Sequence, residues 1–152
     1  MFDYARGLIE PLLFKPDPDL VRKLDYAARN LAHDDAEAVS AATNSLRRLL
    51  TVFANAVFPA QNTPRKGSDG QDIQLGEAQY LNRIKAYVDD KCSSDSRRRN
   101  LKQRVTFVNE RTSGGVHAEV SRSQARFILV SAYVLLGEIL SLDDSFTHMH
   151  DA

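Results

Sequence analysis

The sequence is poor in cysteine and has no excess of either charge, and each absence excludes a class of protein. Its one cysteine, Cys92, excludes an internal disulfide and fits a reducing cytoplasm. The 20 basic and 20 acidic side chains give a formal net charge of zero, so the total charge provides no broad attraction to nucleic acid. Any basic binding site must therefore be local.

Long hydrophobic runs are also lacking. The longest, ARFILVSAYVLLG, is too short to cross a membrane. Asp3, Arg6 and Glu10 interrupt the first apolar stretch, which is untypical of a signal peptide. We therefore expect a cytoplasmic protein without a membrane partner.

Most of the chain has apolar residues at helical spacing, as between Val39 and Val57. With 152 residues, of which 43% are apolar, the chain is long enough for one domain with its own core. We predict an all-α fold, a helical bundle of about five to six helices. The core is expected over about 35–142, with a helical N-terminal extension over 1–32 and a loose tail over 143–152.

Prolines, glycines and capping residues mark where the predicted helices end. Residues 59–76 contain two prolines and three glycines, so we expect a long loop with room for a small hairpin. A loop of this length is either functional or a plain connector. The expected N-terminal caps are Asp17, Asp34 or Asp35, one of Ser93, Ser94 and Asp95, and Ser121, which forms a capping box with Gln124.

The last predicted helix is apolar almost all round between Phe127 and Leu136. Such a helix either lies at the centre of a bundle or is shared with a second subunit. The second alternative predicts a homodimer that forms through this helix.

The stretch NERTSGGVHAEVS places Arg111 and His117 on either side of Gly114 and Gly115, which suit a helix end. A histidine there can exchange protons near neutral pH, and an arginine can hold a phosphate. The pair therefore suits phosphodiester chemistry without a metal. The spacing alone carries little weight, because 14 arginines and four histidines produce about one such pair by chance. In the alternative interpretation, Arg111 covers the helix C-terminus and His117 hydrogen-bonds in the turn.

The segment RRRNLKQR is the densest basic cluster in the chain. A helix can direct several of its cations at one phosphate backbone, which makes this segment a candidate RNA-binding surface. The alternative is a solvated helix face whose arginines point in different directions and whose field is weakened by nearby carboxylates. The candidate RNA-binding residues are Arg97, Arg98, Lys102 and Arg104, and the carboxylates are Asp89, Asp90 and Asp95.

His148 and His150, in the HMH sequence near the end, are of a type that binds transition metals. Two ligands do not make a specific site, and Cys92 has no histidine at a patterned distance. We therefore expect no metal and no cofactor.

Three segments resemble domains of the HEPN superfamily, which are helical bundles of bacterial toxins, abortive-infection proteins and other defence proteins. SLRRLLTVFANAVFP resembles an early helix of one HEPN subgroup, and LNRIKAYVDDK resembles the helix that follows it. VNERTSGGVHAEVSRSQARFILVSAYVLLGEIL resembles the segment with the family's arginine and histidine, and the capped helix after it. The likeness covers about residues 40–142.

Active HEPN ribonucleases have an arginine, four to six residues and then a histidine, which correspond here to Arg111 and His117. The resemblance implies a homodimer whose two motifs face one cleft, and metal-independent RNA cleavage by attack of the ribose 2′-hydroxyl. Thr112 stands where an Asn, Asp or His often follows the arginine, and it would support the pair as a hydrogen-bond donor. This departure keeps an alternative open, a non-catalytic module that dimerises or binds a protein partner of a defence system.

Overall fold

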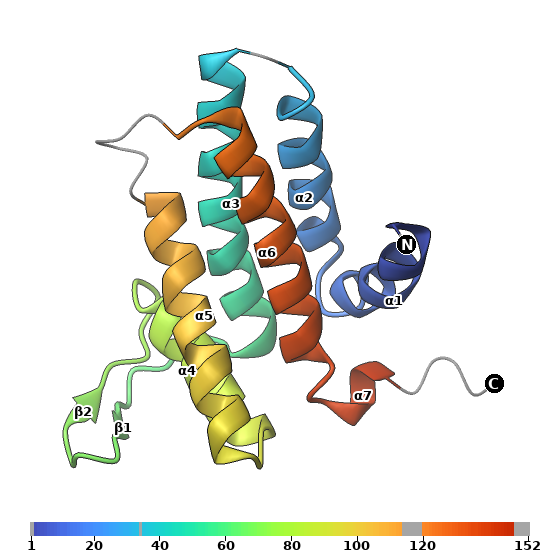
Figure 1. Ribbon diagram of the computed structural model, residues 1–152. Coiled ribbons are helices and arrows are strands. Elements are labelled where there is room, and N and C mark those ends of the chain that lie inside the picture. Colours follow the sequence, from blue (N-terminus) through green and yellow to red (C-terminus); the bar gives the residue numbers. More distant parts are fainter. Residues whose placement is uncertain (1, 34, 114–119, 148–152) are drawn as a thin grey trace.

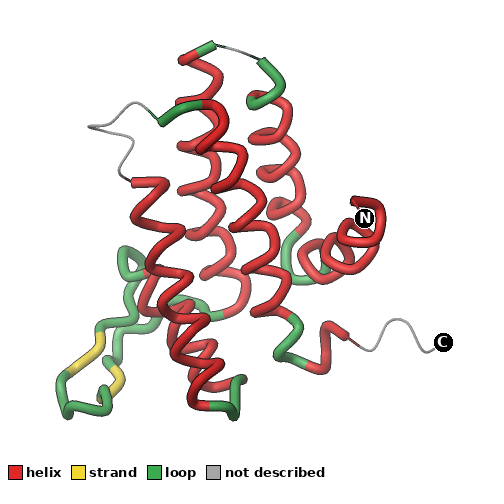
Figure 2. Tube along the Cα trace, viewed as in Figure 1, coloured by secondary structure: helices red, strands yellow, loops and turns green. Residues whose placement is uncertain are grey.

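The computed structural model describes residues 2–33, 35–113 and 120–147. These residues form seven helices and one small antiparallel hairpin, which confirms the predicted all-α bundle (Figure 1, Figure 2). The last helix is a single turn in the tail that the sequence predicts to be loose. The elements are α1 (Phe2–Phe14), α2 (Pro18–Asn30), α3 (Ala36–Val57), β1 (Arg65–Lys66), β2 (Asp72–Ile73), α4 (Tyr80–Lys91), α5 (Asp95–Ser113), α6 (Arg122–Leu140) and α7 (Asp144–Thr147).

Local hydrogen bonds set the helix starts. The carboxylate of Asp17 accepts a hydrogen bond from the backbone N–H of Asp19 at 2.9 Å. Asp35 caps α3 in the same way, and Ser121 and Gln124 form the predicted capping box of α6. Each cap satisfies an N–H group that the helix itself leaves without a partner. The predicted helix starts are confirmed at these positions.

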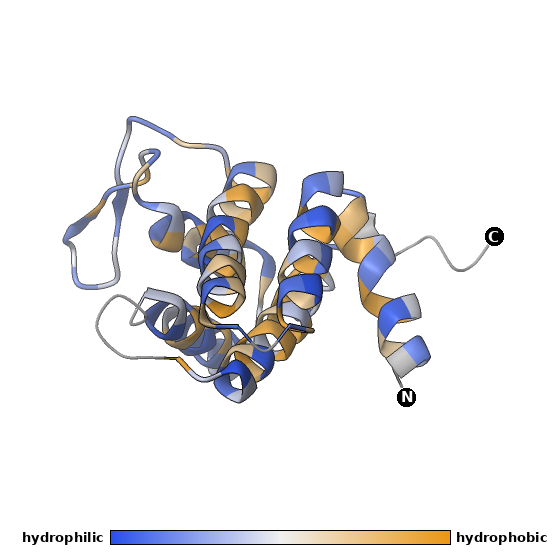
Figure 3. Cartoon of the chain, turned by 90° about the horizontal axis from the view of Figure 1, so that it is seen from above, coloured by the Kyte–Doolittle hydropathy of each residue, from blue (hydrophilic) through white to orange (hydrophobic). Residues whose placement is uncertain are grey.

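Helix α3 lies at the centre of the bundle, where it packs against α2, α4, α5 and α6. Its Leu49, Leu50 and Phe53 side chains are fully buried. The predicted N-terminal extension contributes to the same hydrophobic core through residues such as Leu13 and Leu20. Figure 3 looks down the bundle and shows α1 and the hairpin on opposite sides of it.

Helix α6 is apolar on a buried face and on an exposed face. Ile128 and Leu135 are buried, whereas Phe127, Val130 and Val134 are 68%, 51% and 42% exposed. In the described part of the chain, α6 alone is long and apolar enough to cross a membrane, although its apolar run seemed too short in the sequence. It packs against α1, α3 and α5, and 44% of its apolar stretch is buried within the bundle.

Helix α1 crosses α6 close to its C-terminal end, where Gly137 lets the two backbones approach. A Cβ atom at position 137 would lie 2.8 Å from Cγ2 of Ile9, closer than van der Waals contact allows. The side chain of Ile9 therefore occupies the space that any other residue at position 137 would need. The Tyr133 hydroxyl of α6 also lies 3.5 Å from the carbonyl oxygen of Ala5.

A buried arginine holds the long loop on the bundle. Arg83 is fully buried, and its Nη1 donates to Oδ1 of Asn55 at 2.9 Å and to the Phe58 carbonyl at 3.0 Å. Its Nη2 donates to the Glu77 carbonyl at 3.1 Å. Burial lowers the pKa of Arg83, and the charge of Glu77 opposes that shift. Arg83 thus joins α4 to both ends of the loop, and the loop forms the small hairpin that the sequence allowed over 59–76.

Candidate functional site

Helix α5 carries the candidate residues that the structure describes. Ser94 precedes the helix and caps its N-terminus, because its Oγ accepts a hydrogen bond from the backbone N–H of Arg97 at 3.4 Å. One row of side chains is buried against α3, α4 and α6, and the flanking side chains reach toward α4 or α6. The buried row is Leu101, Val105, Val108 and Thr112.

Two of the four predicted RNA-binding residues turn toward α6. Nη1 of Arg104 lies 2.5 Å from Oε2 of Glu138, and Nη2 of Arg97 lies 3.9 Å from Oε1 of the same carboxylate. Arg97 and Arg104 are two helical turns apart, so they share one flank of α5. Both cations therefore face the same carboxylate on α6.

The other two turn toward α4. Nζ of Lys102 lies 2.9 Å from Oδ1 of Asp89, and Nε of Arg98 lies 3.8 Å from the same atom. Arg98 also pairs with Asp95, one turn earlier on its own helix. The predicted cluster thus divides between two flanks, and carboxylates compensate the charge on both. Asp89 and Asp95, two of the three carboxylates that the sequence placed close by, contact these cations, whereas Asp90 pairs with Arg65.

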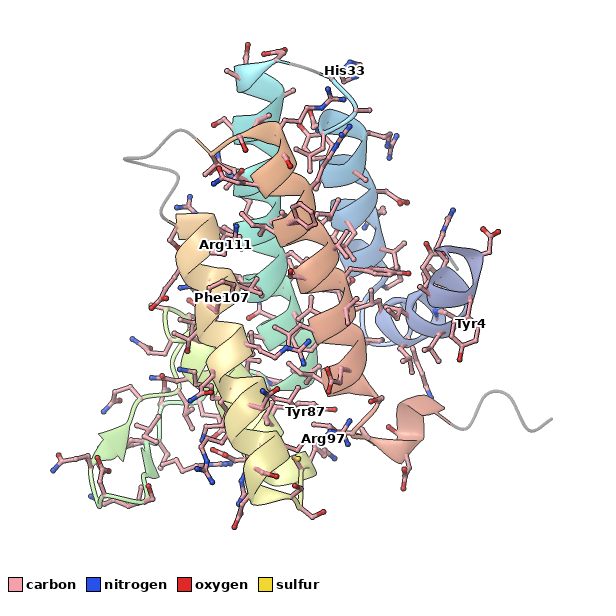
Figure 4. The ribbon with its side chains drawn as sticks, in the orientation of Figure 1. Tyr4, His33, Tyr87, Arg97, Phe107 and Arg111 are labelled. Carbon is pink, nitrogen blue, oxygen red and sulfur yellow. The ribbon has the colours of Figure 1, made fainter. Side chains whose placement is uncertain are left out.

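Arg111 differs from these four residues. It lies in the last turn of α5, is half-buried, and makes no ion pair with a carboxylate in the residues that the structure describes. Its guanidinium carbon lies 5.3 Å from the centre of the Phe107 ring, one turn earlier (Figure 4). Phe107 is itself 53% exposed. A stacked arginine keeps its hydrogen-bonding edge available for an anion.

Thr112 lies beside Arg111 but points inward. It is 4% exposed, and its hydroxyl donates to the Asn109 carbonyl at 2.9 Å. The Asn109 side chain accepts a hydrogen bond from the Tyr80 hydroxyl at 2.6 Å. Thr112 therefore anchors the last turn of α5, and the bond from Tyr80 joins that turn to the start of α4. No spacing pattern in the sequence indicated the link between Tyr80 and Asn109.

His117, Gly114 and Gly115 lie outside the described residues, as do His148 and His150. No group of three or more metal-ligating side chains forms among the residues that are described. Cys92 is buried, and its thiol lies 3.6 Å from the Ser94 carbonyl at the start of α5. The free thiol therefore donates a weak hydrogen bond there.

We compared the chain with protein-family models, with curated proteins and with solved structures. None of the three comparisons found a match. The resemblance to HEPN domains therefore rests on the three quoted segments of the sequence alone, and the all-α fold rests on the structure itself.

Proposed function

We propose that this protein is a HEPN-type, metal-independent endoribonuclease that acts in a bacterial defence or toxin system, in the cytoplasm. Arg111 and His117 form its catalytic pair. The observation that carries the proposal is the environment of Arg111: a half-buried cation, over an exposed aromatic ring and without a carboxylate partner in the described residues. Such a side chain is suited to holding a phosphate.

In the proposed reaction the ribose 2′-hydroxyl attacks the adjacent phosphorus and displaces the 5′-oxygen of the next nucleotide, which leaves a 2′,3′-cyclic phosphate. His117 transfers the protons, and Arg111 stabilises the negative charge that develops on the phosphorane oxygens. The 2′-hydroxyl must align with the leaving oxygen, which favours single-stranded RNA. Phe107 then offers a surface on which a base can stack.

Cleavage of single-stranded RNA in the presence of EDTA tests this proposal. The wild-type protein should produce fragments that end in a 2′,3′-cyclic phosphate, and His117→Ala should lose the activity while its melting temperature is unchanged. Arg47→Ala is the control, because it removes an exposed cation from α3 and should leave the rate of RNA cleavage unchanged. A His117→Ala protein that cleaves as fast as the wild type would refute the catalytic pair.

A second candidate is a non-catalytic module that forms a homodimer or binds a protein partner. The observation in its favour is the exposed face of α6, where Phe127, Val130 and Val134 follow one another at helical spacing. Apolar side chains that are adjacent and exposed are typical of interaction sites. In a homodimer, the α6 faces of two copies would pack together and bury these side chains.

Light scattering on a size-exclusion column tests the second candidate. Phe127→Glu should convert a dimer to a monomer if this face forms the interface. Tyr4→Glu is the control, since Tyr4 is 76% exposed but lies on α1. A wild-type protein that is monomeric at every concentration contradicts the self-association, and loss of RNA cleavage in a Phe127→Glu monomer would mean that the active protein is a dimer.

A further inference from the structure

The hairpin and helices α4 and α5 enclose a groove of about 850 Å³. Figure 1 shows the hairpin standing beside the N-terminal half of α5. The groove lining is rich in cations, although the whole chain has a net charge of zero. The cations are Arg65, Lys66, Lys85, Arg98, Arg99 and Lys102, and the carboxylates of the lining are Asp69, Asp89 and Asp95.

Most of these cations already have partners. Arg65 forms a bidentate pair with Asp90 at 2.7 and 3.0 Å, and Lys66 lies 2.6 Å from Asp72. Asp89 is shared between two further cations of the groove, Arg98 and Lys102. Within the described residues this leaves Lys85 and Arg99 as the groove cations that make no ion pair.

Lys85 is the more informative of the two, because it is half-buried. Burial lowers its pKa first, the positive charge of Lys102 lowers it further, and Glu110 opposes both. Two ammonium groups therefore face one groove, and Asp89 is already in contact with one of them. An anion bound between Lys85 and Lys102 would relieve this repulsion in a partly desolvated place, where charges interact strongly.

An exposed row of side chains leads from the groove to Arg111. Arg99 and Gln103 line the groove, and Phe107 and Arg111 continue the row at the same four-residue interval. Arg99, Gln103 and Phe107 are exposed, and Arg111 is half-buried. At about 1.5 Å per residue, the row extends for about 18 Å along α5. It combines cations at one end with a stacking surface at the other.

We propose that the groove between the hairpin and α5 binds the phosphates of a single-stranded nucleic acid, whose chain continues along α5 to the Phe107 and Arg111 stack. Lys85 and Arg99 hold phosphates, and Phe107 stacks a base. This combination of a cationic groove and an aromatic platform is how proteins bind single strands without reading their sequence. The inference extends the proposed function, because it assigns a path to the RNA that Arg111 and His117 would cleave.

Fluorescence anisotropy of a 5′-labelled oligouridylate measures the binding, with His117→Ala as the background so that the probe stays intact. Lys85→Gln and Arg99→Gln should each weaken binding about tenfold. Each should also reduce the slope of log affinity against log salt by about 0.7, which is the effect of losing one phosphate contact to a single strand. Arg47→Gln should change neither quantity, because it removes an exposed cation from α3, outside the groove. Equal melting temperatures exclude unfolding as the cause.

The outcomes separate the groove from the catalytic proposal. Binding that depends on Lys85 and Arg99 in a protein that never cleaves RNA supports the groove and refutes the nuclease. If the wild-type protein cleaves RNA but Lys85→Gln and Arg99→Gln bind oligouridylate as tightly as their background, the groove proposal is refuted and the nuclease proposal stands. An oligodeoxythymidylate that binds equally well would support recognition of the phosphodiester backbone. Absence of binding at low salt would overturn the inference.

Discussion

The two ends of helix α5 contain the same kind of side chain in opposite electrostatic states. Near its N-terminus, Arg97 and Arg98 face carboxylates of α6 and α4. In its last turn, Arg111 contacts the ring of Phe107 and no carboxylate of the described chain. Most cations of the denser cluster therefore have a carboxylate partner, whereas Arg111 has none in the described residues.

This difference has a general lesson for basic segments. An ion pair on the surface contributes little stability, but it does reduce the field that an approaching phosphate meets. The number of lysines and arginines in a segment is thus a poor guide to a phosphate site. Along α5 and the groove beside it, the cations that make no ion pair in the described residues are Arg111, Lys85 and Arg99, and these are the better guide there.

The largest expected effect concerns Arg111. If the proposed reaction is right, Arg111→Ala should lower the rate of RNA cleavage by about 10²- to 10³-fold, because the charge on the phosphorane would lose its stabilising cation. Arg97→Ala should leave the rate within a few fold of wild type, since Arg97 faces Glu138. Single-turnover kinetics measure both rates. Equal losses of cleavage rate in the two variants would mean that Arg111 has no special role compared with Arg97.

Arg83 extends the comparison to a cation that is fully buried. Arg83→Met should lower the free energy of unfolding by about 2–3 kcal/mol, because the carbonyls of Phe58 and Glu77 and the side chain of Asn55 lose their donor. Urea denaturation measures the loss. Arg83→Lys should recover part of it, because a lysine keeps a donor in place. A Met variant as stable as wild type would mean that water satisfies these groups.

Asp143 extends the comparison to an anion with several partners. Hydrogen bonds from Ser145, and then from Lys91 at 3.0 Å, hold the pKa of Asp143 at about 2, below its usual value of 3.8. A pKa that is lower in the folded state stabilises the protein above about pH 4, and this stability is lost as the pH falls toward 2. The loss should be about 1 kcal/mol, after allowance for solvent screening. Asp143→Asn should remove this part of the pH dependence in urea denaturation, and an unchanged pH profile would contradict the assignment.

The smallest expected effect concerns the paired cations themselves. Arg97→Gln should change the free energy of unfolding by less than about 0.5 kcal/mol, because its 3.9 Å pair with Glu138 is half-exposed. Thermal denaturation at low and high salt measures it. A loss of several kcal/mol would show that the pair is structural, and it would weaken the use of Arg97 as a control for Arg111.

The parts of the fold that depend on neighbouring residues could be predicted from the sequence. Asp17, Asp35 and Ser121 begin helices because their side chains bond N–H groups two or three residues later. Pro59 and the glycines of 59–76 likewise indicated the loop and its hairpin. These signals are local, so a single sequence contains them in full.

The partners of α5 depend on distant residues and could not be predicted in this way. Glu138 is 34 positions from Arg104 and Tyr80 is 29 from Asn109, and no spacing rule connects them. Arg83 gave no signal either, since a charged residue within a helical pattern is expected at the surface. The placement of Thr112 in the buried row depends on how α5 rotates against its neighbours. That rotation comes from the packing of the whole bundle.

The contact between Ile9 and Gly137 makes two distant positions behave as a complementary pair in size. Volume that is added at position 137 can be accommodated only where volume is removed at position 9, because a Cβ atom would meet the isoleucine at 2.8 Å. A methyl group at position 137 would therefore push α1 away from α6. A smaller side chain at 9 would let α1 settle back, so substitutions at these two positions compensate each other when they occur together.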